Sequence, residues 1–342
     1  MALWLVRPGR NDSDVVRILS ENRIWIGQGQ GIHRDLGKIR DKDQLARLVE
    51  ESRPDDSSQK RGSFVGKIFS FTNRMNVGDW VVVPNGTKGT IHIAEITSDY
   101  VFDPKATEKP FHYRNVKWIK TAIPRTDFDP DLLYSFGGQS TIYLPKAKDA
   151  ELRVKELAGK GRPERVVPVP VENGDEPPGV DYELLARDQI TNLIIRKYKG
   201  HELERFVEAI LIARGYVTHR SPTGPDKGVD ILAAAGPLGF ANPRICVQVK
   251  ATEGPVDAPT LNQLIGTMQN VKADQGLLVS WGGFTKAVEK ERAAQFFHVR
   301  LWDREALIDE FLGVYDKLDA EIRAEIPIKQ IWSIAAQDDD EE

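Results

Sequence analysis

Three polar side chains in the second half of the sequence have the types and spacing of a metal-assisted phosphodiesterase site. Gln248 and Lys250 lie two residues apart in an apolar stretch, so in a strand they face the same side of a sheet. Asp230 belongs to an earlier predicted strand that can pair with this one as a hairpin. Carboxylate and amide oxygens suit a hard cation such as Mg²⁺, and an ammonium can orient or deprotonate the attacking water.

The surrounding elements are expected to bring these groups together. A helix is predicted over residues 200–214, strands over 229–232 and 244–250, a helix over 258–269, a strand over 275–280 and a helix over 286–296. This α-β-β-α-β-α order predicts an α/β domain, which we place at residues 186–325. Glu204, on the first helix, can add a second carboxylate to the site.

Each candidate also has an ordinary structural role. Glu204 can pair with Lys199 or Arg205 on the surface of its helix, and Lys250 can be a solvated lysine of an edge strand. Asp226 is expected to cap a turn rather than bind metal. The single cysteine, Cys246, lies between apolar neighbours and is expected to be a small buried hydrophobe. The histidines have no metal-ligand spacing.

An ordered series of motifs in residues 190–315 resembles the catalytic domain of Mrr-type restriction endonucleases. The motifs are Gly200-x-x-Leu-Glu204, Gly215-Tyr, Asp226-x-Gly-Val-Asp230, Val247-Gln-Val-Lys250 and Gly276-Leu-Leu-Val-Ser-Trp-Gly-Gly-Phe-Thr-Lys-Ala. This family is a branch of the PD-(D/E)xK nucleases with glutamine at the (D/E) position, and it implies a restriction-endonuclease-like α/β/α fold.

The resemblance also implies roles for the residues of the site. Asp230, Gln248 and Glu204 would be catalytic metal ligands for Mg²⁺, with Mn²⁺ as a substitute, and Lys250 the catalytic lysine. The family often carries a glutamine on the following helix. By spacing from Gly266, that position is Asn262 here, with Gln263 beside it.

The first 145 residues read as an α+β segment whose second half is rich in short strands, as in a small curled sheet or barrel. Trp4 and Trp80 are expected in its core. Trp25 is different, because a glycine-rich bend follows it and allows close approach of a backbone or a planar ligand.

The order of short motifs around Trp25, residues 75–85, residues 91–96 and Trp118 resembles a PUA-like barrel of the EVE type, a superfamily that reads nucleic acids. The resemblance implies a pocket for an extruded modified base. Trp25 and Trp118 would be its walls, and Gln28 and Asn85 would hydrogen-bond the edge of the base. An aromatic wall would restore about 1–3 kcal/mol of the stacking that the base loses.

Composition sets the remaining limits. Of 342 residues, 40% are hydrophobic and 29% charged, and the net charge is −4, which does not resemble a polyanion binder. The first 150 residues are slightly basic, however, with 23 Lys and Arg against 19 Asp and Glu. A linker rich in Val-Pro and Pro-Gly is predicted over residues 146–185 and an acidic tail over 326–342. With no apolar run of membrane length and no secretory leader, we expect a cytoplasmic protein without membrane contact.

Together these features predict a modification-dependent, type IV-like restriction endonuclease acting in antiviral defence. It would recognise modified double-stranded DNA with the first domain and hydrolyse phosphodiester bonds with Mg²⁺ in the second. Because each chain has one metal site, we expect a homodimer or dimerisation on DNA. Two alternatives remain open: a catalytically inactive nucleic-acid sensor, allowed by the glutamine at 248, and a structure-specific DNA repair nuclease. RNA is also open as the nucleic acid.

Overall fold

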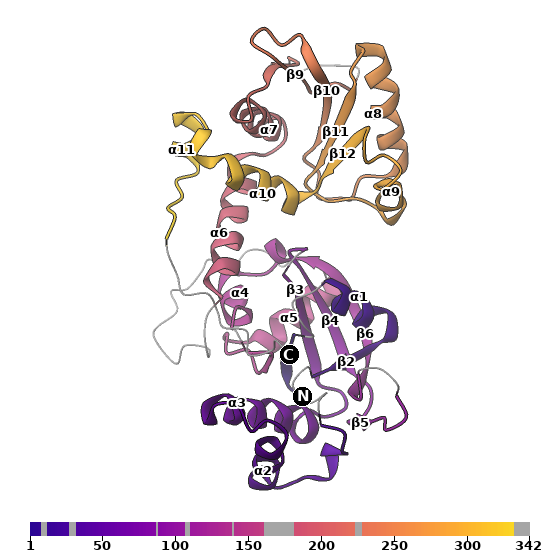
Figure 1. Ribbon diagram of the computed structural model, residues 1–342, viewed down its shortest axis with the longest axis vertical. Helices are drawn as coiled ribbons and strands as arrows, with labels where there is room; N and C mark the ends of the chain where they lie inside the picture. Colours follow the sequence, from indigo (N-terminus) through magenta and orange to yellow (C-terminus); the bar gives the residue numbers. More distant parts are fainter. Residues whose placement is uncertain are drawn as a thin grey trace. The chain divides into compact units, whose positions relative to one another are not determined.

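The computed structural model describes residues 1–7, 12–26, 32–86, 88–106, 110–138, 140–160, 181–222 and 228–331. The chain divides into two compact units, the first ending at Asp188 and the second spanning Gln189–Ile331. Each unit is built around one sheet, which agrees with the predicted division into two α/β and α+β domains (Figure 1). Within the described residues, no helix combines the length and the apolar character needed to cross a membrane.

A curled seven-stranded sheet forms the centre of the first unit, in the order β2-β6-β4-β3-β1-β7 with β5 beside β6. Its strands are β1 (Leu3–Val6), β2 (Arg23–Trp25), β3 (Trp80–Asn85), β4 (Thr90–Ile96), β5 (Val101–Phe102), β6 (His112–Pro124) and β7 (Ile142–Tyr143). All the pairings are antiparallel except that of β1 with β3.

Apolar clusters cover both faces of this sheet. One face packs against α1 (Asp12–Glu21), α2 (Lys42–Ser52) and α3 (Ser58–Phe69), and the other against α4 (Pro130–Phe136) and α5 (Ala150–Lys160). Side chains of Asp41 and Ser57 cap α2 and α3 by accepting backbone N–H bonds, which fixes where these helices begin.

The predicted linker over 146–185 starts too early. Helix α5 lies inside that span, and its Val154 and Leu157 are buried against the sheet, so residues 150–160 belong to the first unit. Asp188 of α6 (Tyr182–Lys197) also belongs to it, because its carboxylate pairs with the buried guanidinium of Arg125 at 2.6 and 2.8 Å. Residues 161–180, the centre of the predicted linker, and residues 332–342 of the predicted tail lie outside the described residues.

The second unit is an α/β/α sandwich with a five-stranded sheet in the order β12-β11-β10-β9-β8. The strands are β8 (Val217–Arg220), β9 (Ile231–Ala235), β10 (Ala241–Lys250), β11 (Gln275–Ser280) and β12 (Val299–Trp302). Helices α7 (Glu202–Ala213) and α10 (Arg304–Val314) cover one face, and α8 (Ala258–Val271) and α9 (Lys286–Glu291) cover the other (Figure 1). The short helix α11 (Ala320–Glu325) follows.

The predicted elements of this unit are present, with three differences. Helix α9 ends at Glu291 rather than at 296, because only Val288 of this segment is buried and no apolar stripe extends it. Strand β8 has mostly exposed side chains, so it carries no apolar alternation that the sequence could reveal. Strand β12 and helix α10 were missed although Val299 and Leu301 alternate with polar or exposed positions, a signal that could have located the strand.

Candidate active site of the second unit

Asp230 lies where β9 and β10 diverge at one end of the sheet. The last paired residue of β9 at this end is Ile231, which lies opposite Val247. Asp230 precedes it, and its backbone N–H donates to the carbonyl of Val247 at 3.1 Å. Its carboxylate accepts a short hydrogen bond from the backbone N–H of Val249. The side chain is 7% exposed. The hairpin predicted from the sequence therefore holds this acid directly against the strand that carries Gln248 and Lys250.

Alternation along β10 decides which face these side chains occupy. Val247 and Val249 pack with α7 and α10 on one face, whereas Cys246 packs with α8 on the other. Gln248 and Lys250 share the face of Cys246, because positions two apart in a strand point to the same side. Gln248 is buried and Lys250 is partly exposed at the end of the strand. This confirms the strand and the spacing on which the predicted triad depends.

The amide of Gln248 has an unusual environment for a buried group. The side chain is 1% exposed, and its Oε1 atom has no hydrogen-bond partner among the described residues. Buried polar atoms are nearly always paired, and leaving one unpaired costs about 1–3 kcal/mol. An unpaired oxygen on the residue preceding Val249, whose N–H holds the Asp230 carboxylate, fits a ligand of a hard divalent cation, which prefers such oxygens.

Gly228 allows three polar side chains to approach the backbone before Asp230. A Cβ at this position would lie 3.6 Å from Nε2 of Gln248, 3.3 Å from Nε2 of Gln263 and 3.8 Å from Oγ1 of Thr267. The φ angle of Gly228 is +82°, a region that glycine adopts readily. The α8 side chain that approaches this backbone is thus that of Gln263, one residue beyond Asn262, the position indicated by the spacing from Gly266 with Gln263 beside it.

The phase of α8 explains that difference. The side chain of Asp257 caps the helix by accepting from the N–H of Thr260, and Leu261 and Leu264 are buried against the sheet. Gln263 lies at the edge of this buried stripe. The buried positions of the stripe, rather than the distance from Gly266, contain the signal that could have identified it.

Glu204 is placed differently from the other predicted ligands. Its helix, α7, packs against the opposite face of the sheet, and its carboxylate pairs with Nδ1 of His201 at 2.7 Å rather than with Lys199 or Arg205. Within the described residues, no three His, Cys, Asp or Glu side chains are grouped as a metal site. That leaves Asp230 and Gln248 as the ligands that fit a metal, and Glu204 as a ligand remains a prediction.

Two further predictions concern the same strands. Cys246 is buried, and burial together with the negative charge of Asp230 raises the pKa of its thiol to about 11. It is therefore a small hydrophobe, as expected. Asp226 lies outside the described residues.

Among the described residues, strand register does not bring the predicted base-binding residues Trp25 and Trp118 together. Trp25 is 6% exposed and belongs to the same core cluster as Ile24, so its ring packs in the core and does not form an accessible wall of a base pocket. It pairs with Tyr113 on β6, five positions from Trp118, which corresponds to about 17 Å along a strand. The side chain of Asn85 accepts from the N–H of Lys88 and shapes the β3–β4 turn. Gln28 lies outside the described residues.

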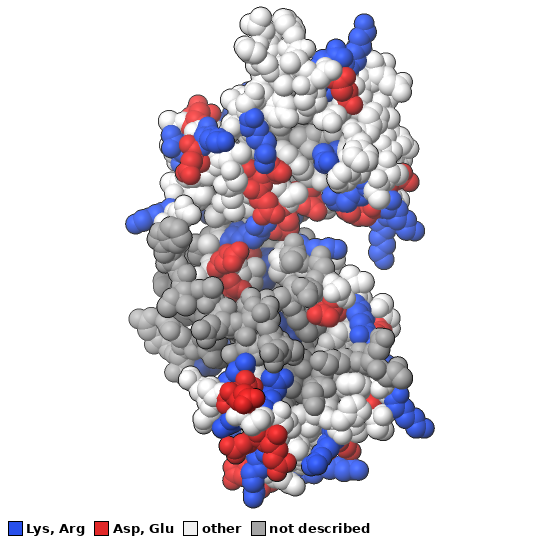
Figure 2. All heavy atoms as spheres, in the orientation of Figure 1, with Lys and Arg blue, Asp and Glu red and all other residues white. Residues whose placement is uncertain are grey.

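The surface charge is mixed in sign. On the face shown in Figure 2, acidic and basic side chains alternate within each unit. Several ion pairs join residues three or four apart in the sequence, such as Arg292 with Glu289 and Lys155 with Glu151. This agrees with the low net charge of the sequence.

Comparisons with known proteins identify the second unit. Residues 195–311 match the Mrr_cat family, described as a restriction endonuclease. Residues 4–143 match DUF8426, a domain family of unknown function. The second unit therefore contains a restriction endonuclease domain, which confirms the resemblance found from its motifs. The PUA-like resemblance of the first unit remains a prediction.

Two solved structures match the chain at low sequence identity. One is described as the DNA modification-dependent restriction endonuclease AspBHI, at 12% identity over 80% of this chain and 74% of that chain, with a TM-score of 0.33. Another is the MspJI restriction endonuclease in complex with a 27-mer oligonucleotide, at 15% identity over 85% of this chain and 70% of that chain, with a TM-score of 0.30. No curated protein matches the chain.

Proposed function

We propose that this protein is a Mg²⁺-dependent endodeoxyribonuclease that cuts modified double-stranded DNA, with Mn²⁺ as a substitute metal. The restriction endonuclease domain at residues 195–311 supports the reaction class. The observation that carries the metal dependence is the buried Oε1 of Gln248, which has no partner in the described part of the chain and belongs to the same β9–β10 fork as Asp230.

The residues of the site have separate tasks in this proposal. The oxygens of Asp230 and Gln248 would hold the metal, and the bound metal would supply an activated water and charge stabilisation at the phosphate. The N–H of Val249 holds the Asp230 carboxylate in place. Lys250, at the open end of β10, would orient the attacking water and neutralise charge on the transferring phosphoryl group.

A neutral glutamine in place of an acid reduces the negative charge of the site. Because Asp230 is the one buried carboxylate among the described residues of this fork, we expect modest metal affinity, with the substrate phosphate contributing further oxygens. Glu204 is the carboxylate that a substrate-bound arrangement would recruit from α7.

Modification dependence is assigned to the first unit. The low net charge of the chain predicts weak non-specific affinity for DNA, so that tight binding would depend on recognition of a particular base. Cutting both strands needs two metal sites, and we expect dimerisation on DNA for that reason.

The test is cleavage of three matched duplexes, unmodified, 5-methylated and 5-hydroxymethylated at cytosine, with Mg²⁺ or Mn²⁺. We expect cleavage of a modified duplex only, its loss in Lys250→Ala, and unchanged cleavage in the matched control Lys317→Ala, whose side chain is exposed. Equal cleavage of all three duplexes would refute modification dependence. Modification-specific binding without any cleavage would instead support a sensor.

A further inference from the structure

Strands β4 and β6 of the first unit pair irregularly around His92. Ile91 pairs with Ile123 and Ile93 with Lys120, so two residues of β6 oppose His92 alone. This is a β-bulge, a feature that re-aims side chains and is frequent beside functional sites. Ala122, one of the two bulged residues, has a φ of +54°, a conformation that is strained for alanine.

The bulge fixes the tautomer of His92, and burial keeps its imidazole uncharged. The backbone N–H of Ala122 donates to Nδ1 of the imidazole at 3.1 Å, so Nδ1 carries no proton. The ring is 4% exposed, and burial together with the positive charge of Lys88 lowers its pKa to about 4. At neutral pH the imidazole is therefore uncharged, and its single proton is on Nε2.

That proton has no acceptor among the residues that the structure describes. Nε2 of His92 is buried and lacks a hydrogen-bond partner among the described residues, and so does the indole N–H of Trp118. The two rings are neighbours, with centroids 6.1 Å apart and planes at 74°. Two adjacent N–H donors without an acceptor are expensive in a folded protein, because each forfeits the hydrogen bond that it made with water.

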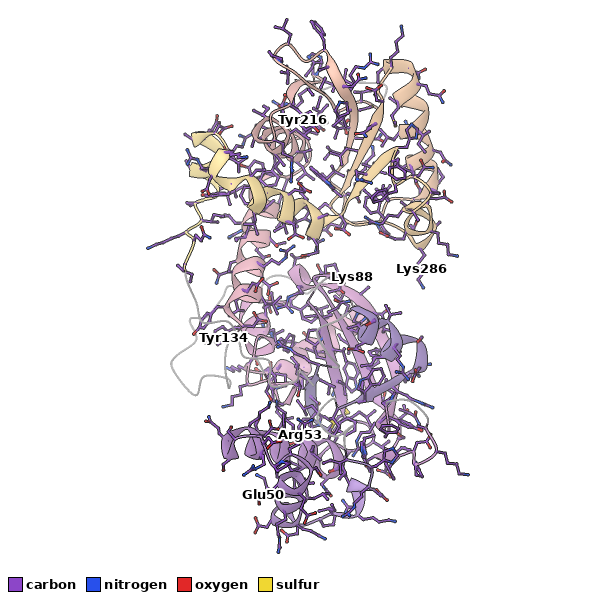
Figure 3. The ribbon with its side chains drawn as sticks, in the orientation of Figure 1. Glu50, Arg53, Lys88, Tyr134, Tyr216 and Lys286 are labelled. Atoms are coloured by element: carbon purple, nitrogen blue, oxygen red, sulfur yellow. The ribbon has the colours of Figure 1, made fainter. Side chains whose placement is uncertain are left out.

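The position is close to the surface and to positive charge. Trp118 is partly exposed, and its neighbours Lys117 and Ile119 are exposed. Lys88 lies on the turn between β3 and β4 and is labelled in Figure 3. A ligand that combines a flat ring, an acceptor oxygen and a nearby negative charge would match these groups. A nucleotide extruded from DNA has all three.

We propose that His92 and Trp118 form a two-donor site for the oxygen of an oxygen-bearing modified base, with 5-hydroxymethylcytosine and its glycosylated forms as the ligand class. The inference rests on the proposed function, since it assumes that the first unit reads an extruded base. A hydroxyl or glycosidic oxygen accepts from Nε2–H of His92 and Nε1–H of Trp118. A methyl group leaves both donors unpaired, so 5-methylcytosine binds more weakly.

The test measures binding of the full-length protein to hydroxymethylated, methylated and unmodified duplexes by fluorescence anisotropy, in EDTA to prevent cleavage. His92→Asn keeps an acceptor for the Ala122 N–H but removes the Nε2 donor. Trp118→Phe keeps an aromatic ring but removes the indole N–H. In each variant, the ratio of the affinity for the hydroxymethylated duplex to that for the methylated duplex is expected to fall by roughly 10- to 100-fold.

Two controls separate recognition from folding. His92→Gln places an amide N–H near the position of Nε2 and is expected to retain the preference within about threefold. Trp80→Phe changes a tryptophan that packs against the cluster on the other face of the sheet, and it is expected to have no effect. Affinity for the unmodified duplex serves as the measure that all variants remain folded and bind phosphates.

The outcomes distinguish the two proposals. If the wild type prefers a modified duplex but His92→Asn and Trp118→Phe keep its preference, the donor pair serves only the fold or an internal water, and this inference is wrong. A wild type that prefers methylated over hydroxymethylated DNA also overturns it, while the proposed function stands. A wild type with no preference refutes the reader function itself.

Discussion

The buried imidazole of His92 makes the stability of the first unit depend on pH. Its pKa is lowered from 6.5 to about 4 by burial and by Lys88. Above pH 6.5 the imidazole is neutral in both the folded and the unfolded chain and contributes no pH dependence. Below pH 6.5 only the unfolded chain takes up the proton, so protonation favours unfolding until the pH reaches about 4.

The size of the effect follows from the two pKa values. With 6.5 in the unfolded chain and about 4 in the folded one, linkage lowers the free energy of unfolding by about 2 kcal/mol between pH 7.5 and pH 5. His92→Gln removes the titrating group while retaining a polar side chain. Between pH 7.5 and pH 5, the free energy of unfolding of the variant should therefore fall by about 2 kcal/mol less than that of the wild type.

Hydrogen exchange of peptides from β4 and β6 is the suitable assay, because it reports the opening of one unit and does not require the two units to unfold together. Wild type and variant are compared at both pH values after correction for intrinsic exchange rates. Equal changes in the two proteins, within about 0.5 kcal/mol, would refute the reasoning. Such a result would show that the imidazole of His92 accepts a proton as readily in the folded chain as in the unfolded chain.

Three further predictions concern the second unit. Gln248→Glu should retain cleavage and lower the Mg²⁺ concentration for half-maximal rate, because a carboxylate binds the metal more tightly, whereas Gln248→Leu should abolish cleavage; a metal titration of both variants checks this. Gly228→Ala should reduce cleavage at least tenfold in a DNA-nicking assay, because the backbone has a φ of +82° there and the new Cβ would lie 3.3 Å from Nε2 of Gln263. The control Gly266→Ala should cleave like the wild type, because a Cβ at that position meets nothing within 4 Å. Cys246 should react with a thiol reagent at pH 8 only after unfolding, because a pKa of about 11 leaves roughly one thiol in a thousand ionised and the side chain is buried; rapid native-state labelling would contradict this.

Local pattern was sufficient to predict most of the second unit. Strand β11 has the bounds that its apolar run predicts, and helix α8 begins where Asp257 caps it. The sequence also predicts that Asp230 lies beside the strand of Gln248 and Lys250, because hairpin pairing and the two-residue period of a strand are local properties. The sequence prediction missed β8, whose exposed side chains have no apolar alternation, and it also missed β12 and α10.

Spacing along the chain was less reliable where a side chain must cross between elements. The distance from Gly266 indicated Asn262, but the rotation of α8 over the sheet is fixed by Leu261 and Leu264 and presents Gln263 instead. Likewise, Trp25 and Trp118 are similar residues beside similar short motifs, yet strand register separates them by about 17 Å. Register and helix rotation are properties of packing, and residue types alone do not determine them.

The sequence also does not reveal which buried polar atoms lack a hydrogen-bond partner. Gln248 and His92 are both buried on strands, and each presents one polar atom that has no partner within the described residues. An apolar residue of similar size would satisfy either core at lower cost, since burying an unpaired polar atom costs about 1–3 kcal/mol. In the two proposals made above, a partner from outside the chain would offset that cost. The same argument supports both proposals: an unpaired oxygen at Gln248 would accept a cation, and an unpaired N–H at His92 would donate to an acceptor atom.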